Sequence, residues 1–308
     1  MLMAAAMLRP PVGRGLGAVV VLTLREAWRS PVFVLLWAAL LLLTGAAPRF
    51  DFLALREKQL LVVDSLAALA LTGSALTGVL LALEATGGEV RRGGVALWLA
   101  RGVRPGTWLA GKFIGLALAL VPLAVTLALG LAFASRIAWE PLLPDLVASR
   151  AWFWAFGGGL VAAAVAVWRG ARWGPALVLA WPVALGLAAA AVAGRGEGWA
   201  AEDWAVLPMA LQAWDGATLL AWVAAVLALR LDTVTAWWVA GVVWLVGLSA
   251  DYWLTGAARA LWAAGPSWAL FQQAGGWAGA LRSVAYLACY GVALLAWAAG
   301  WRGWREAR

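Results

Sequence analysis

Two carboxylates at opposite ends of one apolar stretch, residues 60–83, are the side chains best suited to chemistry within a membrane. Asp64 lies about one turn inside the stretch, within reach of Arg56 or Lys58, and Glu84 ends it. On a helix, 20 residues separate two side chains by about 30 Å, so these acids cannot form a catalytic pair. Acids inside a bilayer are costly and default to functional candidates. We favour structural or interfacial roles over transport chemistry for both.

Other catalytic chemistry is poorly supported. The chain has no histidine and one cysteine, Cys289, so the usual zinc, haem and iron–sulfur ligand sets cannot be built within one subunit. No Ser-His or Cys-His nucleophile can be assembled either. The segment GTWLAGKF, from Gly106 to Phe113, has phosphate-loop spacing but ends in Phe where Ser or Thr is needed, and it leads into an apolar span. We therefore expect no catalytic residue, metal or cofactor.

Composition indicates a polytopic helical membrane protein. Hydrophobic residues make up 65% of the 308 residues and charged residues 12%, which leaves too little polar surface to solvate a soluble globule of this size. Because a helix of about 20 apolar residues spans a bilayer core, we predict an all-α bundle of about eight transmembrane helices, with six as the fallback. The predicted spans are 31–48, 60–83, 109–134, 152–168, 174–194, 214–229, 234–254 and 284–301.

The distribution of basic residues predicts the orientation. Of the 23 Lys and Arg residues, 15 fall in the N-terminal segment 1–30, the loops assigned to the inside and the C-terminal tail, and 8 fall outside. The positive-inside tendency places both termini, and the polar block at residues 84–108, in the cytoplasm. Arginines interrupt the apolar N-terminus, so no cleavable signal peptide is expected. The net charge of +8 is spread along span ends, which fits anionic lipid and not nucleic acid.

The polar block between the second and third spans is the most distinctive segment. Its residues Val90, Leu97 and Trp98 fall on one helical face, while Glu89 and Arg92 point elsewhere. This pattern predicts one short amphipathic helix along the membrane surface. A cytoplasmic segment tied at both ends to membrane helices can receive a mechanical push.

Small residues mark predicted helix-packing faces, because small-x-x-x-small spacing lets helix backbones approach closely. It occurs twice in the second span and once at the start of the third. The predicted packing residues are Gly73, Ser74, Thr77, Gly78, Gly111 and Gly115. The 24 tryptophans fit either an aromatic-lined path for an amphiphilic substrate or packing against lipid and neighbouring helices, and we favour packing.

Several segments, in order, resemble the permease subunits of ATP-binding-cassette exporters of the type 2 class. After the second span these permeases carry an acidic residue, a glycine-containing turn, a Leu-rich stretch ending in Ala-Arg-Pro-Val-Ser-Arg, and a Gly-Lys that opens the third span. The equivalents here are Glu89, Gly94, LWLARGVRP and Gly111-Lys112. Gly102 replaces the usual Pro, and Arg104-Pro105 replaces Ser-Arg. Four further segments are similar to those permeases: REAWRSPVFVLLWAALLLL, the pair of spans within 219–254, the stretch from Pro266 to Phe271 and the basic tail.

This resemblance implies a membrane-spanning permease of the bacterial inner membrane with no enzymatic activity of its own. Its expected partners are a cytoplasmic ATP-binding-cassette ATPase subunit, a second permease subunit and membrane lipids. Ion coupling is disfavoured, because charges near the bilayer midplane are nearly absent from the predicted spans. Residues 150–213 do not fit the common six-span pattern and are expected to add two spans. The residues expected to couple the 84–108 loop to the ATPase are Glu89, Arg91, Arg92, Leu97, Trp98, Arg101 and Arg104.

Two other functions remain open. One is a lipid- or polyprenyl-handling membrane enzyme that uses acids of an outside loop, such as Glu202 and Asp203. The other is a noncatalytic scaffold subunit of an exporter complex. The absence of histidine and of clustered acids and bases argues against the enzyme.

Overall fold

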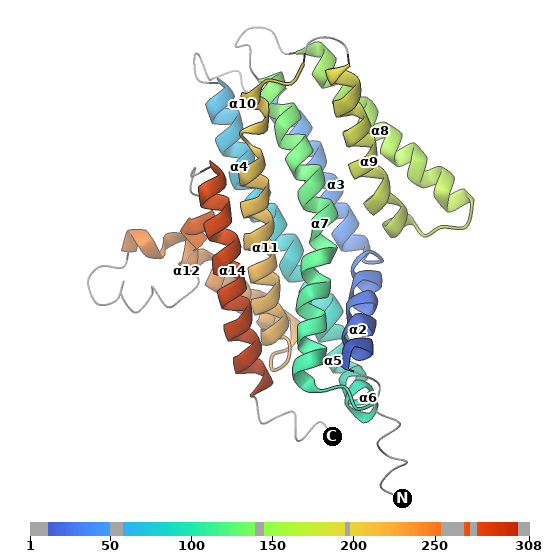
Figure 1. Ribbon diagram of the computed structural model, residues 1–308, viewed down its shortest axis with the longest axis vertical. Coiled ribbons are helices and arrows are strands. Elements are labelled where there is room, and N and C mark those ends of the chain that lie inside the picture. Colours follow the sequence, from blue (N-terminus) through green and yellow to red (C-terminus); the bar gives the residue numbers. More distant parts are fainter. Residues whose placement is uncertain are drawn as a thin grey trace, which may run out of the picture.

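The computed structural model describes residues 12–49, 58–138, 145–194, 198–253, 268–271 and 276–300, and these form helices without strands (Figure 1). The protein is an all-α, polytopic helical bundle. Within the described residues, seven helices are long and apolar enough to cross a membrane. They are α3 (Pro31–Ala46) continued by η1 (Ala47–Arg49), α4 (Lys58–Ala82), α7 (Pro105–Ile137), α8 (Leu146–Trp168), α9 (Trp173–Ala193), α11 (Leu207–Leu227) and α14 (Gly276–Ala299). The remaining predicted span corresponds to α12 (Thr233–Trp253), whose apolar part, Thr233–Ser249, is shorter.

Two predicted boundaries were wrong by seven or more residues. The span predicted at 214–229 begins at Leu207, so part of the expected loop 195–213 is helical, and α10 (Ala201–Trp204) lies in the same stretch. The last span begins at Gly276 and not at residue 284. Both helices start with glycine, proline or polar residues that lower the local hydropathy, and tertiary packing extends the helix across them.

The remaining elements are one helix of 16 residues and several shorter ones. An amphipathic N-terminal helix, α2 (Val12–Ala27), packs against α7, and a turn at residues 28–30 leads into α3. Ser30 caps α3 by accepting a hydrogen bond from the amide of Phe33, with Pro31 in the first turn. The remaining short elements are η1 (Ala47–Arg49), η2 (Leu83–Gly87), α5 (Gly88–Arg91), α6 (Gly94–Ala100) and η3 (Trp268–Phe271).

The start of α8 shows how an acid fixes a helix end. Asp145 accepts hydrogen bonds from the amides of Val147 and Ala148 and from the Nε of Arg136 at the end of α7. Burial favours the protonated acid, but the arginine and the two amides outweigh it and hold the pKa of Asp145 below its usual value. The cap and the ion pair together tie α8 to α7.

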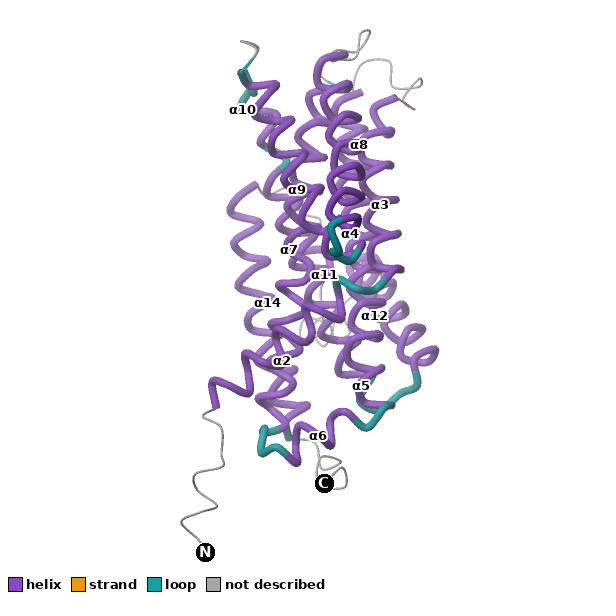
Figure 2. The backbone as a smooth tube through the Cα atoms, turned by 90° about the vertical axis from the view of Figure 1, so that its right-hand side faces the viewer, coloured by secondary structure: helices purple, strands orange, loops and turns teal. Residues whose placement is uncertain are grey.

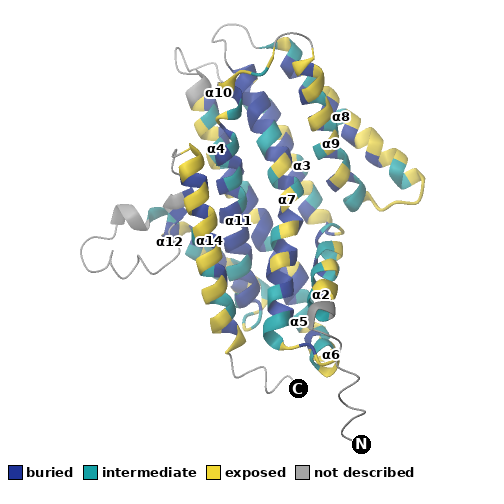
Figure 3. Ribbon diagram, in the orientation of Figure 1, coloured by how far each residue is buried: buried dark blue, intermediate teal, exposed yellow. Residues whose placement is uncertain are grey.

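The centre of the bundle is formed by α4, α7 and α11, and α14 covers one side of α11 (Figure 3). A Cβ added to Gly78 would lie 2.6 Å from the carbonyl oxygen of Ala217, so α4 and α11 meet there backbone to backbone. Gly111 and Gly115 of α7 contact α2, and Gly73 contacts Leu40 of α3. Ser74 and Thr77 are buried. The four glycines thus lie at helix contacts inside the subunit, and the two hydroxyl residues are buried beside them in α4.

Several tryptophans form hydrogen bonds from one helix to another. Three indoles, one in the turn after α2 and two on α11, donate hydrogen bonds to backbone carbonyls of α7, and a fourth, on α3, donates to a threonine there. The pairs are Trp28 with Ala119, Trp214 with Ala117, Trp222 with Phe113 and Trp37 with Thr126. The α8–α9 hairpin, which covers most of the expected two-span insertion, lies at the side of the bundle (Figure 1).

Candidate functional site

The segment between α4 and α7 forms a compact elbow at one end of the bundle (Figure 2). The predicted single amphipathic helix is wrong: α5 and α6 are separate, and α7 already begins at Pro105. Gly93 has a left-handed backbone, with φ of 70°, which a continuing helix cannot adopt. The glycine pair at 93–94 is therefore the physical cause of the break.

Gly102 ends α6. Its φ is 83°, its amide bonds to the carbonyl of Leu99, and the amide of Val103 bonds to the carbonyl of Trp98. This is a Schellman ending, which glycine favours. Proline, locked near a φ of about −65°, cannot adopt this conformation.

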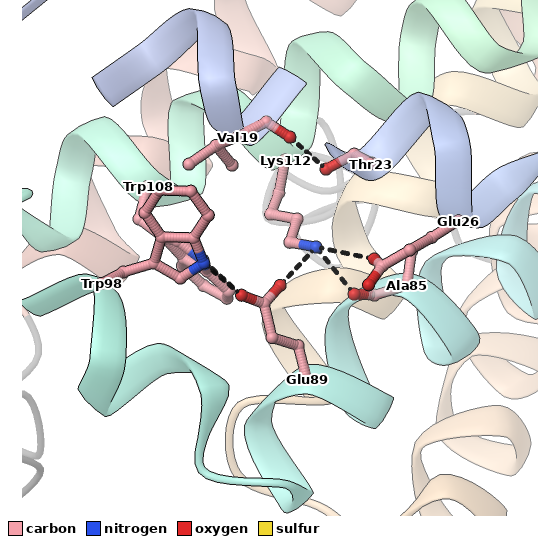
Figure 4. A network of polar contacts seen from close by, with 8 residues as sticks. All are labelled: Val19, Thr23, Glu26, Ala85, Glu89, Trp98, Trp108 and Lys112. Carbon is pink, nitrogen blue, oxygen red and sulfur yellow. Dashed lines mark hydrogen bonds and ion pairs between the residues drawn. The ribbon is translucent and has the colours of Figure 1, made fainter. Parts of the chain in front are cut away.

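Lys112 is the centre of a buried ion network (Figure 4). It is fully buried near the start of α7, and its Nζ lies 2.5 Å from Oε2 of Glu89 on α5 and 3.3 Å from Oε2 of Glu26 on α2. Nζ also donates to the carbonyl of Ala85 in η2, at 2.8 Å. An ammonium group has three donors, and here three oxygens from three different elements surround it.

A π-helical turn shapes one of these contacts. In η2 the helix widens for one turn directly after α4, and Ala85, whose carbonyl meets Lys112, lies in its middle. Such turns are rare and occur frequently at functional sites. The widened turn therefore links the end of α4 to the same lysine that holds α5 and α2.

Two indoles complete the environment of Glu89. Trp98 of α6 donates to its Oε1 at 2.5 Å, and Trp108 of α7 does so at 3.4 Å. The Glu89 side chain is only 8% exposed, whereas that of Glu26 is 36% exposed. A buried charge is tolerated only when it is paired and hydrogen-bonded, so these contacts depend on one another. The network joins α2, η2, α5, α6 and α7 into one unit.

Glu89 therefore points into the elbow, where we expected it on an outward-facing charged surface. Trp98 also faces inward, whereas Leu97 is 64% exposed. The arginines of the segment are all exposed, and they are Arg91, Arg92, Arg101 and Arg104. The segment thus has an internal anion, an exposed leucine and an arginine-rich outer surface.

A cleft of about 400 Å³ opens beside the network, between α2 and the η2–α5 segment. Arg29, Arg91 and Arg92 contribute positive charge to its lining, and Glu26, Glu84 and Glu89 contribute negative charge. Glu84 is itself exposed at this edge, which fits the interfacial role expected for it. The cleft and the exposed arginines lie at the same end of the bundle.

The other predicted acids do not form a cluster. Asp64 is exposed on α4, and the side chains of its suggested partners, Arg56 and Lys58, lie outside the described residues. Asp203 is buried and accepts a hydrogen bond from the amide of Ala200, a local helix-start contact. The Glu202 side chain, Pro266 and the C-terminal tail also lie outside the described residues.

One buried acid was missed. Asp215 lies in the ninth position of α11, is 0% exposed and contacts the hydroxyl of Ser283 on α14 at 2.5 Å. The expectation that charges are nearly absent from the spans is therefore incomplete. The hydroxyl of Ser283 donates to Oδ2 of Asp215 and also lies 2.7 Å from the carbonyl of Ala280, so its single hydrogen is shared between the two acceptors.

Comparisons of the chain with protein-family models, with curated proteins and with solved structures found no match. The function is therefore argued from the site alone.

Proposed function

We propose that this protein is the membrane-spanning permease subunit of an ATP-binding-cassette exporter, and that the elbow between α4 and α7 receives the movement of a separate ATPase subunit. The observation that carries this proposal is the Lys112 network. Because one buried ammonium holds α5, η2, α2 and α7, a force on the short helices is transmitted to two long helices and the N-terminal helix.

The exposed charges of the elbow support the same proposal. Arg91, Arg92, Arg101 and Arg104 present four cations next to a cleft whose edges carry acids as well. A partner with a complementary mixture of charges could dock here through pairs that become partly desolvated. In this arrangement the arginines bind the partner, and the inward-facing Glu89 and Lys112 transmit its movement.

Reversing two docking charges tests this division of roles. We expect Arg92→Glu combined with Arg101→Glu to weaken copurification of the ATPase subunit at least tenfold, because losing one partner of a desolvated interface pair costs about 2–5 kcal/mol. Arg172→Glu, at an exposed arginine between α8 and α9, serves as the control. Both variants should reach the membrane in normal amounts.

The opposite result is equally informative. A charge pair that stays exposed to solvent contributes only about 0–1 kcal/mol to the free energy of binding or folding. If the double variant and the control retained the ATPase equally well, docking through the elbow would be excluded, and the arginines would be interpreted as contacts with lipid headgroups.

A further inference from the structure

The α8–α9 hairpin carries a feature that the coupling role does not use. An open groove of about 680 Å³ runs between the two helices, within the range of volumes that bind small ligands. Its walls are almost wholly apolar and are made mainly of alanine, glycine and valine. The lining contains one charged residue, Arg150, near the start of α8.

The groove has the length of one bilayer leaflet. Arg150, Trp154, Gly158 and Ala162 follow one another at intervals of four residues, so they form a single ridge along α8. With a rise of about 1.5 Å per residue, this ridge is about 18 Å long, against about 15 Å for half of a hydrocarbon core. On α9, Ala180, Ala184 and Ala188 form the facing wall. Small side chains on both walls keep the channel open.

The polar end of the groove has the features of a headgroup site. Arg150 is exposed, and among the described residues no carboxylate forms an ion pair with it. Trp154, one turn further along, is 79% exposed, and its indole suits the boundary between headgroups and acyl chains. A guanidinium group binds a phosphate through paired hydrogen bonds. The order along the groove is therefore cation, indole, then apolar channel.

We propose that the α8–α9 groove binds one anionic phospholipid from the bilayer, with its phosphate at Arg150 and one acyl chain along the ridge to Ala162. The length of the channel matches an acyl chain, and the positive charge of Arg150 selects an anionic over a neutral headgroup. The proposal does not depend on the exporter function, because the groove is lined by α8 and α9 alone and by no residue of the elbow.

Two glycines allow a matched test of the channel. A Cβ added to Gly158 or to Gly157 meets no heavy atom within 4 Å, so a side chain can begin at either position without displacing its neighbours. Only Gly158 lines the groove. For the cation, Arg150→Gln is compared with Arg169→Gln, at an exposed arginine beyond the opposite end of α8.

The experiment is native mass spectrometry of the purified protein with phosphatidylglycerol or phosphatidylcholine of identical acyl chains. We expect the wild type to retain one phosphatidylglycerol, Arg150→Gln to reduce the preference for it about fivefold, and Gly158→Leu to lose both lipids. Gly157→Leu and Arg169→Gln should behave as the wild type. Melting temperatures of all variants check that the fold is kept.

Either of two results would overturn the proposal. One is an unchanged lipid preference in Arg150→Gln together with equal binding by the two glycine variants. The other is disulfide cross-linking between two copies that carry Ala184→Cys in a Cys289→Ala background, with loss of the bound lipid, which would make a second copy of the chain the occupant.

Discussion

Lys112→Met is expected to lower the free energy of unfolding by about 3–5 kcal/mol, because it leaves the buried carboxylate of Glu89 without its cation. Methionine has nearly the same length as lysine, so the change removes charge more than volume. Thermal unfolding in detergent, followed by tryptophan fluorescence, measures the effect. The signal sums the emission of 24 tryptophans, so it reports on unfolding of the whole bundle.

A second substitution separates stability from coupling. In Lys112→Met combined with Glu89→Gln, no uncompensated charge remains at Glu89, and we expect most of the lost stability to return. Transport per ATP hydrolysed should stay low, because the helices are no longer held by the ion pair. Arg92→Gln, at an exposed site, should change stability by no more than about 0.5 kcal/mol. Recovery of transport in the double variant would mean that the network has only a structural role.

Ser283→Ala is expected to destabilise the protein by about 1–3 kcal/mol, the cost of leaving a buried polar group without a partner. The affected group is Asp215, whose other oxygen, Oδ1, has no hydrogen-bond partner among the described residues. Asp215→Asn should be close to the wild type, since the amide oxygen can accept the hydrogen bond from Ser283 as the carboxyl oxygen does. Replacing both partners by apolar residues, Asp215→Leu with Ser283→Ala, should cost less than Ser283→Ala alone.

These variants also decide what Asp215 does. If Asp215→Asn folds normally and supports transport, the acid is a structural element of the contact between α11 and α14. If Asp215→Asn folds normally but abolishes transport, the structural role is wrong and a role in proton or substrate movement replaces it. Thermal unfolding and a vesicle transport assay on the same preparations distinguish these outcomes.

The membrane class and the approximate positions of the spans could be predicted from the sequence because long apolar runs have one stable solution in a bilayer. The predicted span boundaries were wrong where polar residues lie inside a helix. The predicted span at 214–229 made Asp215 an end residue, whereas α11 begins seven residues earlier and buries it. Only contact with Ser283, 68 residues along the chain, makes that burial acceptable.

The sequence predicted which segment forms the candidate site, but it did not predict the contacts of that segment with other helices. The block 84–108 was identified, and the glycine pair within it was a usable signal for the break between α5 and α6. The inward turn of Glu89 could not be inferred from helical periodicity, because its partners come from α6 and α7. Lys112 offered an unused signal: a lysine that opens a long apolar span needs a counter-ion nearby.

Site-specific cross-linking at the elbow tests the central claim most directly. A photoreactive amino acid at position 92, with position 154 on the α8–α9 hairpin as the control, is activated in membranes that contain the permease and the candidate ATPase subunit. The coupling account predicts a cross-link from position 92 to a chain that carries a phosphate-binding loop, with a yield that changes when ATP hydrolysis is trapped, and none from position 154. Cross-links from position 92 to lipid alone, in membranes where transport is active, would contradict it.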